Sequence, residues 1–135
     1  MSKYFYIKQE DAMDCGLASL ATILLYYNKP YSLNYLKELA DYNNELGTNF
    51  FQLYNVAIKL GFKATAATLK SIKLLNDIKL PCIAQIQIST DDMHFVVIYE
   101  VKINTIIIAD PSKGIRELPF EKFENCFTNK ILLIY

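Results

Sequence analysis

The chain has 135 residues, of which 53% are apolar, and its fourteen basic and fourteen acidic side chains cancel to a net charge of zero. This length suits a single domain with a substantial core. The balanced, scattered charges argue against nucleic acid as the main partner, because phosphate binding normally leaves a basic patch on the protein.

Hydropathy along the chain argues against two further classes, membrane-spanning and secreted proteins. No apolar run approaches the ~18 to 20 residues that a membrane-spanning helix needs. The start, MSKYFYIKQED, lacks the positive end, long apolar stretch and cleavage site of a signal peptide. We therefore expect the chain, taken by itself, to be soluble and cytoplasmic.

The cysteines and glycines point to no metal or cofactor. Cys15, Cys82 and Cys126 are an odd number of cysteines at wide spacing, which predicts neither a disulfide framework nor a CxxC pair. With a single histidine in the chain, a structural metal site is not expected. Glycine-rich phosphate loops of the Walker or dinucleotide-binding type are also absent from the sequence.

The first half of the chain has the pattern of helices. Three helices are predicted, over residues 15–27, 32–42 and 48–60. The first is apolar around nearly its whole circumference, which is typical of a buried helix. Each has a suitable N-cap, namely Asp14, Ser32, and either Thr48 or Asn49. Gly61 is suited to end the third helix at the C′ position.

The pattern changes from helices to strands after Gly61. The main predicted strands cover residues 62–69, 81–89, 94–101, 105–111 and 130–135, with a shorter strand at 116–118. Short helical segments are predicted at residues 71–77 and 120–125. Helices first and an antiparallel sheet second predict an α+β fold, in which an N-terminal helical part packs against a C-terminal sheet.

Cys15 is the first candidate for chemistry, because it lies at the start of a predicted helix. Unpaired backbone N–H groups and the positive end of the helix dipole favour the thiolate there. The thiolate is the nucleophilic form of cysteine. Gly16 would leave room beside it for a substrate backbone. A lone cysteine is more often a small buried core residue, so the assignment depends on its partners.

His94, the only histidine, opens a predicted strand. If this strand and the next form a hairpin centred near residue 102, His94 falls opposite Asp110. Directly opposed side chains have Cβ atoms roughly 4.5 to 5.5 Å apart. At that distance an aspartate can accept the Nδ1–H bond, fix the tautomer and stabilise the imidazolium. The alternatives are a packed or surface histidine and an aspartate that starts a turn before Pro111.

Gln9 is a candidate donor to a reaction intermediate. Acyl transfer needs hydrogen-bond donors aimed at the developing oxyanion. The backbone N–H of Cys15 is one candidate for this role. The side-chain amide of Gln9, six residues upstream on the segment that leads into the helix, can supply the second. Taken alone, Gln9 would be an ordinary surface glutamine.

In chain order these residues resemble a known family. The matching motifs are Gln9, Asp14-Cys15-Gly16 at the start of an apolar helix, His94-Phe95-Val96-Val97, and Asp110-Pro111. Their order and spacing are similar to the peptidase domain of bacteriocin-exporting ABC transporters, which are papain-like cysteine peptidases that cut double-glycine leader peptides. The resemblance runs over essentially the whole chain. It implies four roles: Cys15 as nucleophile, His94 as base, Asp110 as its orienting partner and Gln9 as oxyanion donor.

The resemblance also implies where the domain works. Residues 1–135 would form one peptidase domain, normally followed by a transmembrane domain and an ATPase domain, on the cytoplasmic side of the cell membrane. ATP would bind the separate ATPase domain, and the peptidase itself would need no cofactor. The partners would be those two domains and the leader of a secreted peptide precursor. Because the chain stops at Tyr135 inside an apolar run, we expect a domain excised from a larger transporter, with a free-standing peptidase as the alternative.

One stretch departs from the family pattern. Members often carry a tryptophan and a glycine before the last strand, where this chain has Cys126 or Phe127, and Asn129. The departure concerns local packing rather than the chemistry.

The expected reaction is hydrolysis of the peptide bond after Gly-Gly, through a thioester on Cys15. A narrow cleft that rejects any Cβ would select the glycines, and an apolar groove would hold the leader helix. One alternative is a catalytically silent domain that only binds the leader; the intact Cys15, His94 and Asp110 argue against it. The other is a papain-like amide hydrolase or acyltransferase of different specificity, which would use the same residues.

Overall fold

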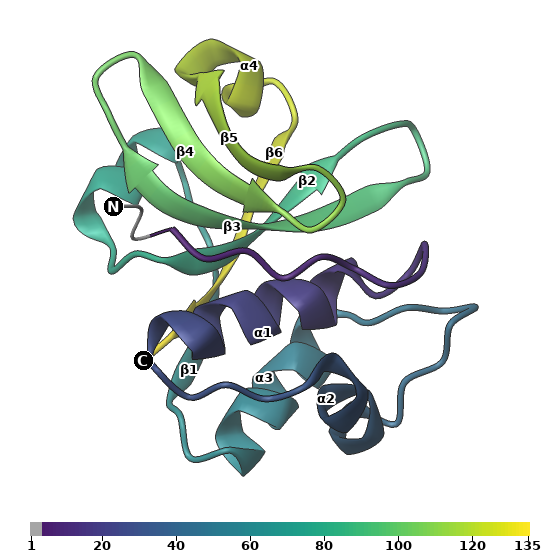
Figure 1. Ribbon diagram of the computed structural model, residues 1–135. Coiled ribbons are helices and arrows are strands. Elements are labelled where there is room, and N and C mark those ends of the chain that lie inside the picture. The colour runs from purple at the N-terminus through teal and green to yellow at the C-terminus, as the bar shows by residue number, and fades with distance from the viewer. Residues whose placement is uncertain (1–3) are drawn as a thin grey trace.

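The computed structural model describes residues 4–135, which form a layer of helices packed against a six-stranded antiparallel sheet (Figure 1). The helices of the first half are α1 (Cys15–Tyr26), α2 (Leu33–Ala40) and α3 (Phe50–Lys59). The strands are β1 (Ala64–Thr68), β2 (Cys82–Gln87), β3 (Met93–Val101), β4 (Thr105–Asp110), β5 (Gly114–Pro119) and β6 (Phe127–Ile134). A 3₁₀ helix, η1 (Ile72–Asp77), follows β1, and α4 (Phe120–Glu124) follows β5. The predicted α+β fold is confirmed.

Helix α1 is the centre of the helical layer. Its residues from Cys15 to Leu24 are all buried, because apolar side chains surround it and every face contacts either the sheet or the other helices. The predicted capping of the next two helices is also correct. Ser32 accepts from the N–H of Tyr35 at the start of α2, and Asn49, rather than Thr48, forms a capping box at the start of α3.

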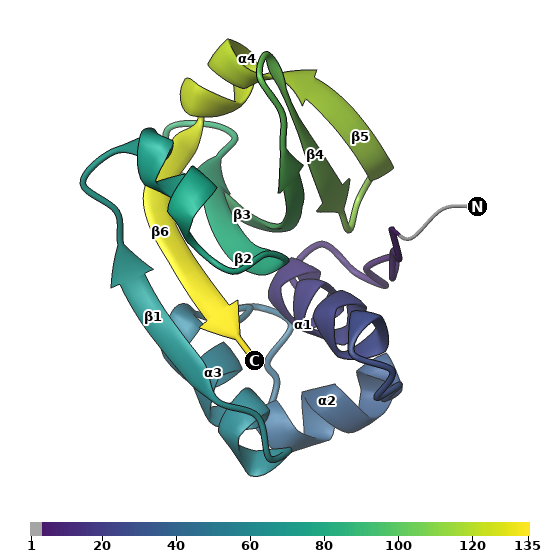
Figure 2. The ribbon, with the colours of Figure 1, turned by 90° about the vertical axis from the view of Figure 1, so that its left-hand side faces the viewer.

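The strands lie in the order β1-β6-β2-β3-β4-β5, and all neighbouring strands are antiparallel (Figure 2). β6 is the last strand in the chain, yet it lies between β1 and β2. β3 is central, with β2 on one side and β4 on the other. A bulge interrupts the pairing of β3 with β4 between Ile98 and Glu100.

Side chains of the central strands alternate between the two faces of the sheet. In β3, Phe95, Val97 and Tyr99 join the core beneath the helices, whereas Val96 and Ile98 join a second core on the opposite face. The second core is closed by η1 and α4 (Figure 1). The sheet is therefore covered on both faces, and the start of α1 is held close to the start of β3. Within residues 4–135, no helix combines the length and the apolar character needed to cross a membrane.

Candidate active site

Cys15 is the first residue of α1 and is only 8% exposed. The backbone N–H of Phe95, at the start of β3, donates a hydrogen bond to its Sγ at 3.5 Å. Cys15 also lines a cavity of about 500 Å³. The thiol is therefore covered by protein on one side and open to a cavity on the other.

Asp14 lies at the N-cap position of α1, as predicted, but its side chain does not cap the helix. Its carboxylate faces back along the chain, where it accepts from the N–H groups of Glu10 at 3.0 Å and Asp11 at 3.3 Å. It also pairs with the ammonium of Lys37 at 3.0 Å. The predicted cap is wrong because these partners take the carboxylate. As a result, the first turn of α1 keeps its N–H groups free of a side-chain cap.

His94 and Asp110 are bonded to each other, with Nε2 and Oδ1 2.8 Å apart. The side chains of His94 and Cys15 also interact, and this interaction contributes to the raised pKa of His94. The prediction that Nδ1 would face the aspartate is wrong. His94 reaches Asp110 from further along the strand than expected, and Nε2 is the ring nitrogen farther from the backbone.

The register of β3 and β4 explains that longer reach. The turn between them is centred on Ile103 and Asn104, because Val101 pairs with Ile106. Val97 pairs with Ala109, and continuing this register sets position 96, not 94, opposite position 110. Direct opposition of the two site residues is therefore a wrong prediction. The contact still forms, because positions 94 and 96 share one face of the strand and the pair meets diagonally.

The charges of this pair are stabilised by its neighbours. Burial alone would lower the pKa of His94, but hydrogen bonds with Asp110 and Cys15 outweigh it and raise the pKa to about 9. Burial would raise the pKa of Asp110, but hydrogen bonds from His94 and Ser112 lower it to about 2. The imidazolium and the carboxylate are therefore both charged at neutral pH.

Ser112 is a site residue that the sequence analysis missed. Its backbone N–H and its hydroxyl both donate to Asp110 Oδ1, at 2.8 and 2.7 Å. Arg116 adds a longer ionic contact, 3.9 Å from Nη1 to Oδ2. A signal was present in the sequence, since an aspartate followed two residues later by serine is typical of a turn closed by side-chain hydrogen bonds.

Gln9 reaches the site through its backbone. Its N–H donates to the carbonyl of Pro111 at 3.0 Å, directly beyond Asp110. Its side-chain Nε2 donates to the carbonyl of Asp11 at 2.8 Å, while Oε1 is buried and has no partner among the described residues. The structure thus brings Cys15, His94 and Asp110 together, through the His94–Asp110 bond and the bond from the Phe95 N–H to Cys15, whereas the Gln9 amide is bonded within its own loop.

The cavity beside Cys15 has an apolar rim. Leu46 is 80% exposed and Phe51 is 70% exposed, and both line this cavity together with Met93 and Phe95. Large apolar side chains this exposed, gathered around one opening, are typical of a binding surface. The arrangement can hold an apolar segment close to the Cys15 thiol.

A glycine is needed at position 16 for a different reason from the one predicted. A Cβ at this position would lie 2.4 Å from Thr48 Oγ1 and 3.1 Å from the ring of Phe95. Gly16 is itself buried. The glycine therefore allows close packing of α1 against its neighbours, rather than leaving room for a substrate.

The two remaining cysteines, Cys82 and Cys126, lie away from Cys15, His94 and Asp110. Cys82 is fully buried, and burial raises its pKa to about 12. Cys126 is half-buried, and burial raises its pKa as well. Cys82 therefore lies in the core, whereas Cys126 is only partly covered.

A cysteine at the start of a buried helix, beside a hydrogen-bonded histidine and aspartate from an antiparallel sheet, defines the class of papain-like cysteine peptidases. The family follows from comparison with known proteins. The chain belongs to the Peptidase C39 family, whose model matches residues 3–135. The resemblance stated from the sequence is confirmed.

Individual relatives give the same result. The chain is 35% identical to the sublancin-168-processing and transport ATP-binding protein SunT of Bacillus subtilis, over 98% of this chain and 19% of the relative. It thus spans about one fifth of the length of this curated relative. Among solved structures, it matches the peptidase domain of Streptococcus ComA with a TM-score of 0.87 at 30% identity, over 97% of both chains. A double glycine motif protease from an AMS/PCAT transporter, solved in complex with the leader peptide, matches with a TM-score of 0.86 at 31% identity, over 96% of this chain and 89% of that one.

The structure places Phe127 and Asn129, where the sequence departs from the family pattern, inside the last strand, β6. Asn129 takes the place of the usual glycine and has a φ of +67°. This left-handed conformation favours glycine, and asparagine tolerates it better than most other residues. Phe127 packs against Phe123 with ring centroids 5.2 Å apart. Asn129 thus accommodates a left-handed backbone within β6, and Phe127 supplies an aromatic contact with α4.

Proposed function

We propose that this chain is a cysteine peptidase that cleaves the leader of a secreted peptide precursor after a Gly-Gly pair. The observation that carries the proposal is the His94 imidazole, bonded to Asp110 at 2.8 Å, together with the neighbouring Phe95 N–H, which bonds the Cys15 Sγ at 3.5 Å. A histidine held in this way can stabilise a thiolate and then transfer a proton to a leaving group. The double glycine motif protease solved with its leader peptide supports the substrate class.

In the first step, the Cys15 thiolate attacks the carbonyl carbon of the second glycine. The peptide C–N bond breaks, and His94 gives its proton to the leaving amine. Because the pKa of His94 is about 9, the required imidazolium is present at neutral pH. The product of this step is a thioester between the leader and Cys15, with a neutral His94.

In the second step, His94 takes a proton from water, and the hydroxide attacks the thioester carbonyl. The C–S bond breaks, which releases the leader with a free carboxyl group and restores the thiolate. Asp110, charged at neutral pH because its pKa is about 2, stabilises the imidazolium before and after the reaction. The enzyme returns to its starting charges.

The oxyanion of both steps would be stabilised by the N–H of Cys15 and the side-chain amide of Gln9. The carboxylate of Asp14 is bonded elsewhere and does not cap the helix, so it does not compete with an oxyanion at this end of α1. Nε2 of Gln9 already uses one hydrogen to bond Asp11. An amide nitrogen has a second hydrogen, which would serve the oxyanion.

The leader would lie along the apolar rim of the cavity beside Cys15. The exposed side chains of Leu46, Phe51 and Met93 offer the contacts that the apolar face of an amphipathic helix needs. We further propose that the domain serves a larger exporter, with transmembrane and ATPase domains, on the cytoplasmic side of the cell membrane. ATP would bind the ATPase domain, and the peptidase would need no cofactor.

The test is incubation with a synthetic precursor that contains a leader helix, a Gly-Gly pair and a short cargo, followed by mass spectrometry. The expected product ends at the second glycine and is absent with Cys15→Ala. Changing that glycine to alanine should lower kcat/KM by roughly 10²-fold, since a reacting carbonyl displaced by about 1 Å loses that much. Binding without cleavage would instead indicate a silent leader-binding domain. Equal cleavage of the alanine variant would indicate an amide hydrolase of broader specificity.

A further inference from the structure

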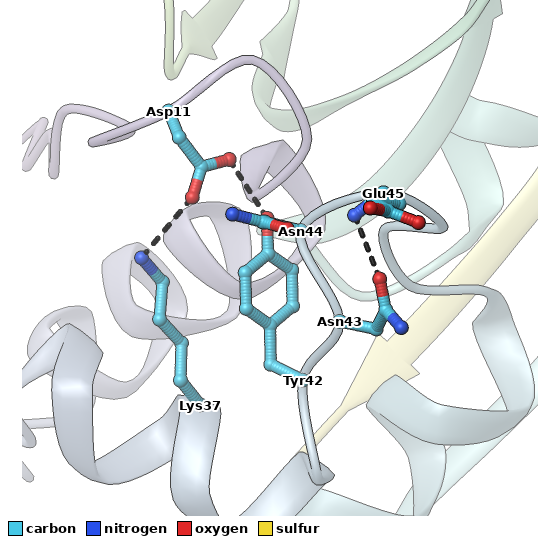
Figure 3. Close-up of a pocket in the computed structure, with 6 residues that line it drawn as sticks. All are labelled: Asp11, Lys37, Tyr42, Asn43, Asn44 and Glu45. Atoms are coloured by element: carbon cyan, nitrogen blue, oxygen red, sulfur yellow. Dashed lines mark hydrogen bonds and ion pairs between the residues drawn. The ribbon is translucent and has the colours of Figure 1, made fainter.

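Lys37, on α2, pairs with three carboxylates of one loop, the loop of residues 9–14 that precedes Cys15. Its Nζ lies 3.0 Å from Asp14, 3.1 Å from Glu10 and 3.5 Å from Asp11. Figure 3 shows the Lys37 side chain extending from its helix to the Asp11 carboxylate, with Tyr42 beside it. The Lys37 side chain is only 18% exposed. One ammonium group thus ties this loop to the helical layer.

Asp14 depends most on this ammonium, because its side chain is fully buried. Across residues 4–135, Lys37 is the only cation paired with it. A buried carboxylate that loses its counter-charge is strongly destabilised and tends to rearrange towards water. Because Cys15 follows Asp14 directly, such a rearrangement would move the start of α1.

Asp11 connects the same ammonium to Gln9. Its carboxylate accepts from the Tyr42 hydroxyl at 2.7 Å and from the N–H of Met13, also at 2.7 Å. Its carbonyl accepts from Gln9 Nε2 at 2.8 Å. The position of the Gln9 amide is therefore set by a residue whose side chain Lys37 and Tyr42 hold in place (Figure 3).

We infer that Lys37 is a positioning residue of the active site, which holds the loop of residues 9–14 so that Gln9 and Cys15 face the reacting carbonyl together. The inference rests on the proposed peptidase function for its kinetic consequence. Lys37 touches neither Cys15 nor His94 and acts through Asp14 and Asp11. Its charge is secure, because hydrogen bonds to Asp14 and Glu10 overcome the effect of burial and raise its pKa.

Kinetics on the leader substrate test this role with three variants. Lys37→Met should lower kcat by roughly 10- to 100-fold, because small misplacements of reacting groups are costly. Its KM should change less than its kcat, since Leu46, Phe51 and Met93 lie outside the loop and only Ala12 and Met13 of the loop line the cavity. Lys37→Arg keeps the charge and should restore most of kcat. The matched control is Lys59→Met on α3, an exposed lysine whose Nζ, within residues 4–135, bonds only the carbonyl of Leu39, and it should behave as wild type.

A second measurement does not depend on cleavage. The N–H groups of Glu10 and Asp11, bonded to Asp14, should exchange with solvent slowly in wild type and faster in Lys37→Met, as followed by NMR. If that variant fails to fold, the double variant Lys37→Met with Asp14→Asn removes both charges. It keeps an amide oxygen as acceptor for these N–H groups, so it should fold. Its N–H groups of Glu10 and Asp11 should exchange more slowly than those of the double variant Lys37→Met with Asp14→Ala, which lacks the acceptor.

Wild-type kcat in Lys37→Met, or unchanged exchange in the loop, would overturn the inference. An equal loss in Lys59→Met would do the same. If wild type cleaves no Gly-Gly precursor, the proposed function fails, and the exchange measurement still decides whether Lys37 holds the loop.

Discussion

His94 and Asp110 meet diagonally across strands β3 and β4, with Nε2 and Oδ1 2.8 Å apart. Because the β3–β4 register does not set the two residues opposite each other, the contact depends on the length of the imidazole and on the fixed position of the carboxylate. Ser112 fixes that carboxylate through two hydrogen bonds. The His94 charge is thus controlled by a turn that follows β4 as well as by the strand pairing.

Replacing Asp110 with Asn should move the alkaline limit of activity to lower pH. The pKa of His94 is raised from 6.5 to about 9, so in wild type kcat/KM should fall as the pH rises through about 9 and the imidazolium is lost. Asn removes the negative charge, so the pKa should drop towards 6.5 and the falling limb should follow it. The measurement is kcat/KM from pH 5 to 10. An unmoved limb would show that the limit belongs to another group.

Ser112→Ala should loosen the position of the Asp110 carboxylate, and its effect should be milder than that of Asp110→Asn. The variant removes the hydroxyl donor to the buried Asp110 carboxylate and keeps the backbone N–H, so we expect a loss of about 1.5 to 3 kcal/mol in the free energy of unfolding, as for one hydrogen bond to a charged group. Activity should fall less than in Asp110→Asn. The matched control is Ser89→Ala, because Ser89 makes a similar 2.8 Å bond to Asp92 at an exposed site. Equal stability changes in the two serine variants, measured by urea unfolding, would contradict a specific role for Ser112.

The three cysteines should differ in their rates of alkylation. Cys15 lines a cavity and interacts with His94, whereas Cys82 is fully buried with a pKa raised to about 12. Iodoacetamide followed by peptide mapping should therefore label Cys15 first, Cys126 later and Cys82 last. In urea all three should react, which serves as the control for the reagent. Equal rates in the folded protein would show that Cys15 is not activated.

Gln9→Glu should lower kcat by roughly 10²- to 10³-fold, the usual loss of one oxyanion donor. The change keeps the size of the side chain but replaces the amide donor with a carboxylate. It also removes the bond from Nε2 to Asp11. Gln9→Ala separates the loss of the amide donor from the effect of the added charge, since it lacks the amide without introducing a carboxylate. An effect on KM alone in both variants would make Gln9 a substrate-binding residue instead.

Gly16→Ala should be destabilising by about 1 to 3 kcal/mol, as is usual for overpacking in a core. The new Cβ would lie 2.4 Å from Thr48 Oγ1. Adding Thr48→Ala removes that oxygen and should recover part of the loss. Thermal unfolding of the single and double variants tests this, and a double variant no more stable than Gly16→Ala would show that another contact forbids the side chain.

Much of this fold follows from periodicity and capping. The apolar circumference of α1, the Ser32 and Asn49 caps and the alternation of the strands are local features, and local patterns report them. The candidate site residues could also be predicted from the sequence, because their types and their order are chemically distinctive. Strand order was not, since alternation reports which face a residue occupies and not which strand lies beside it.

The pairing of Asp14 with Lys37 could not be predicted from local sequence patterns either. Sequence position made Asp14 an N-cap, but the burial of its carboxylate depends on how α2 packs beside the loop. The ring nitrogen that faces Asp110 depends in turn on where the β3–β4 turn is centred. A shift of this centre by one or two residues changes the distance that the His94 side chain must span to reach Asp110. No residue type in the hairpin indicates where the centre lies.

The position of β6 has a consequence for synthesis on the ribosome. β6 is made last, yet it joins β1 to β2. While residues 127–134 are still inside the exit tunnel, β2 has one bare edge, and β1 lacks the strand with which it pairs. Unpaired edges of apolar strands are the sites at which incomplete chains associate wrongly. This domain therefore completes its sheet only after translation has passed its last strand, and the interval before that is when a nascent chain most needs a chaperone.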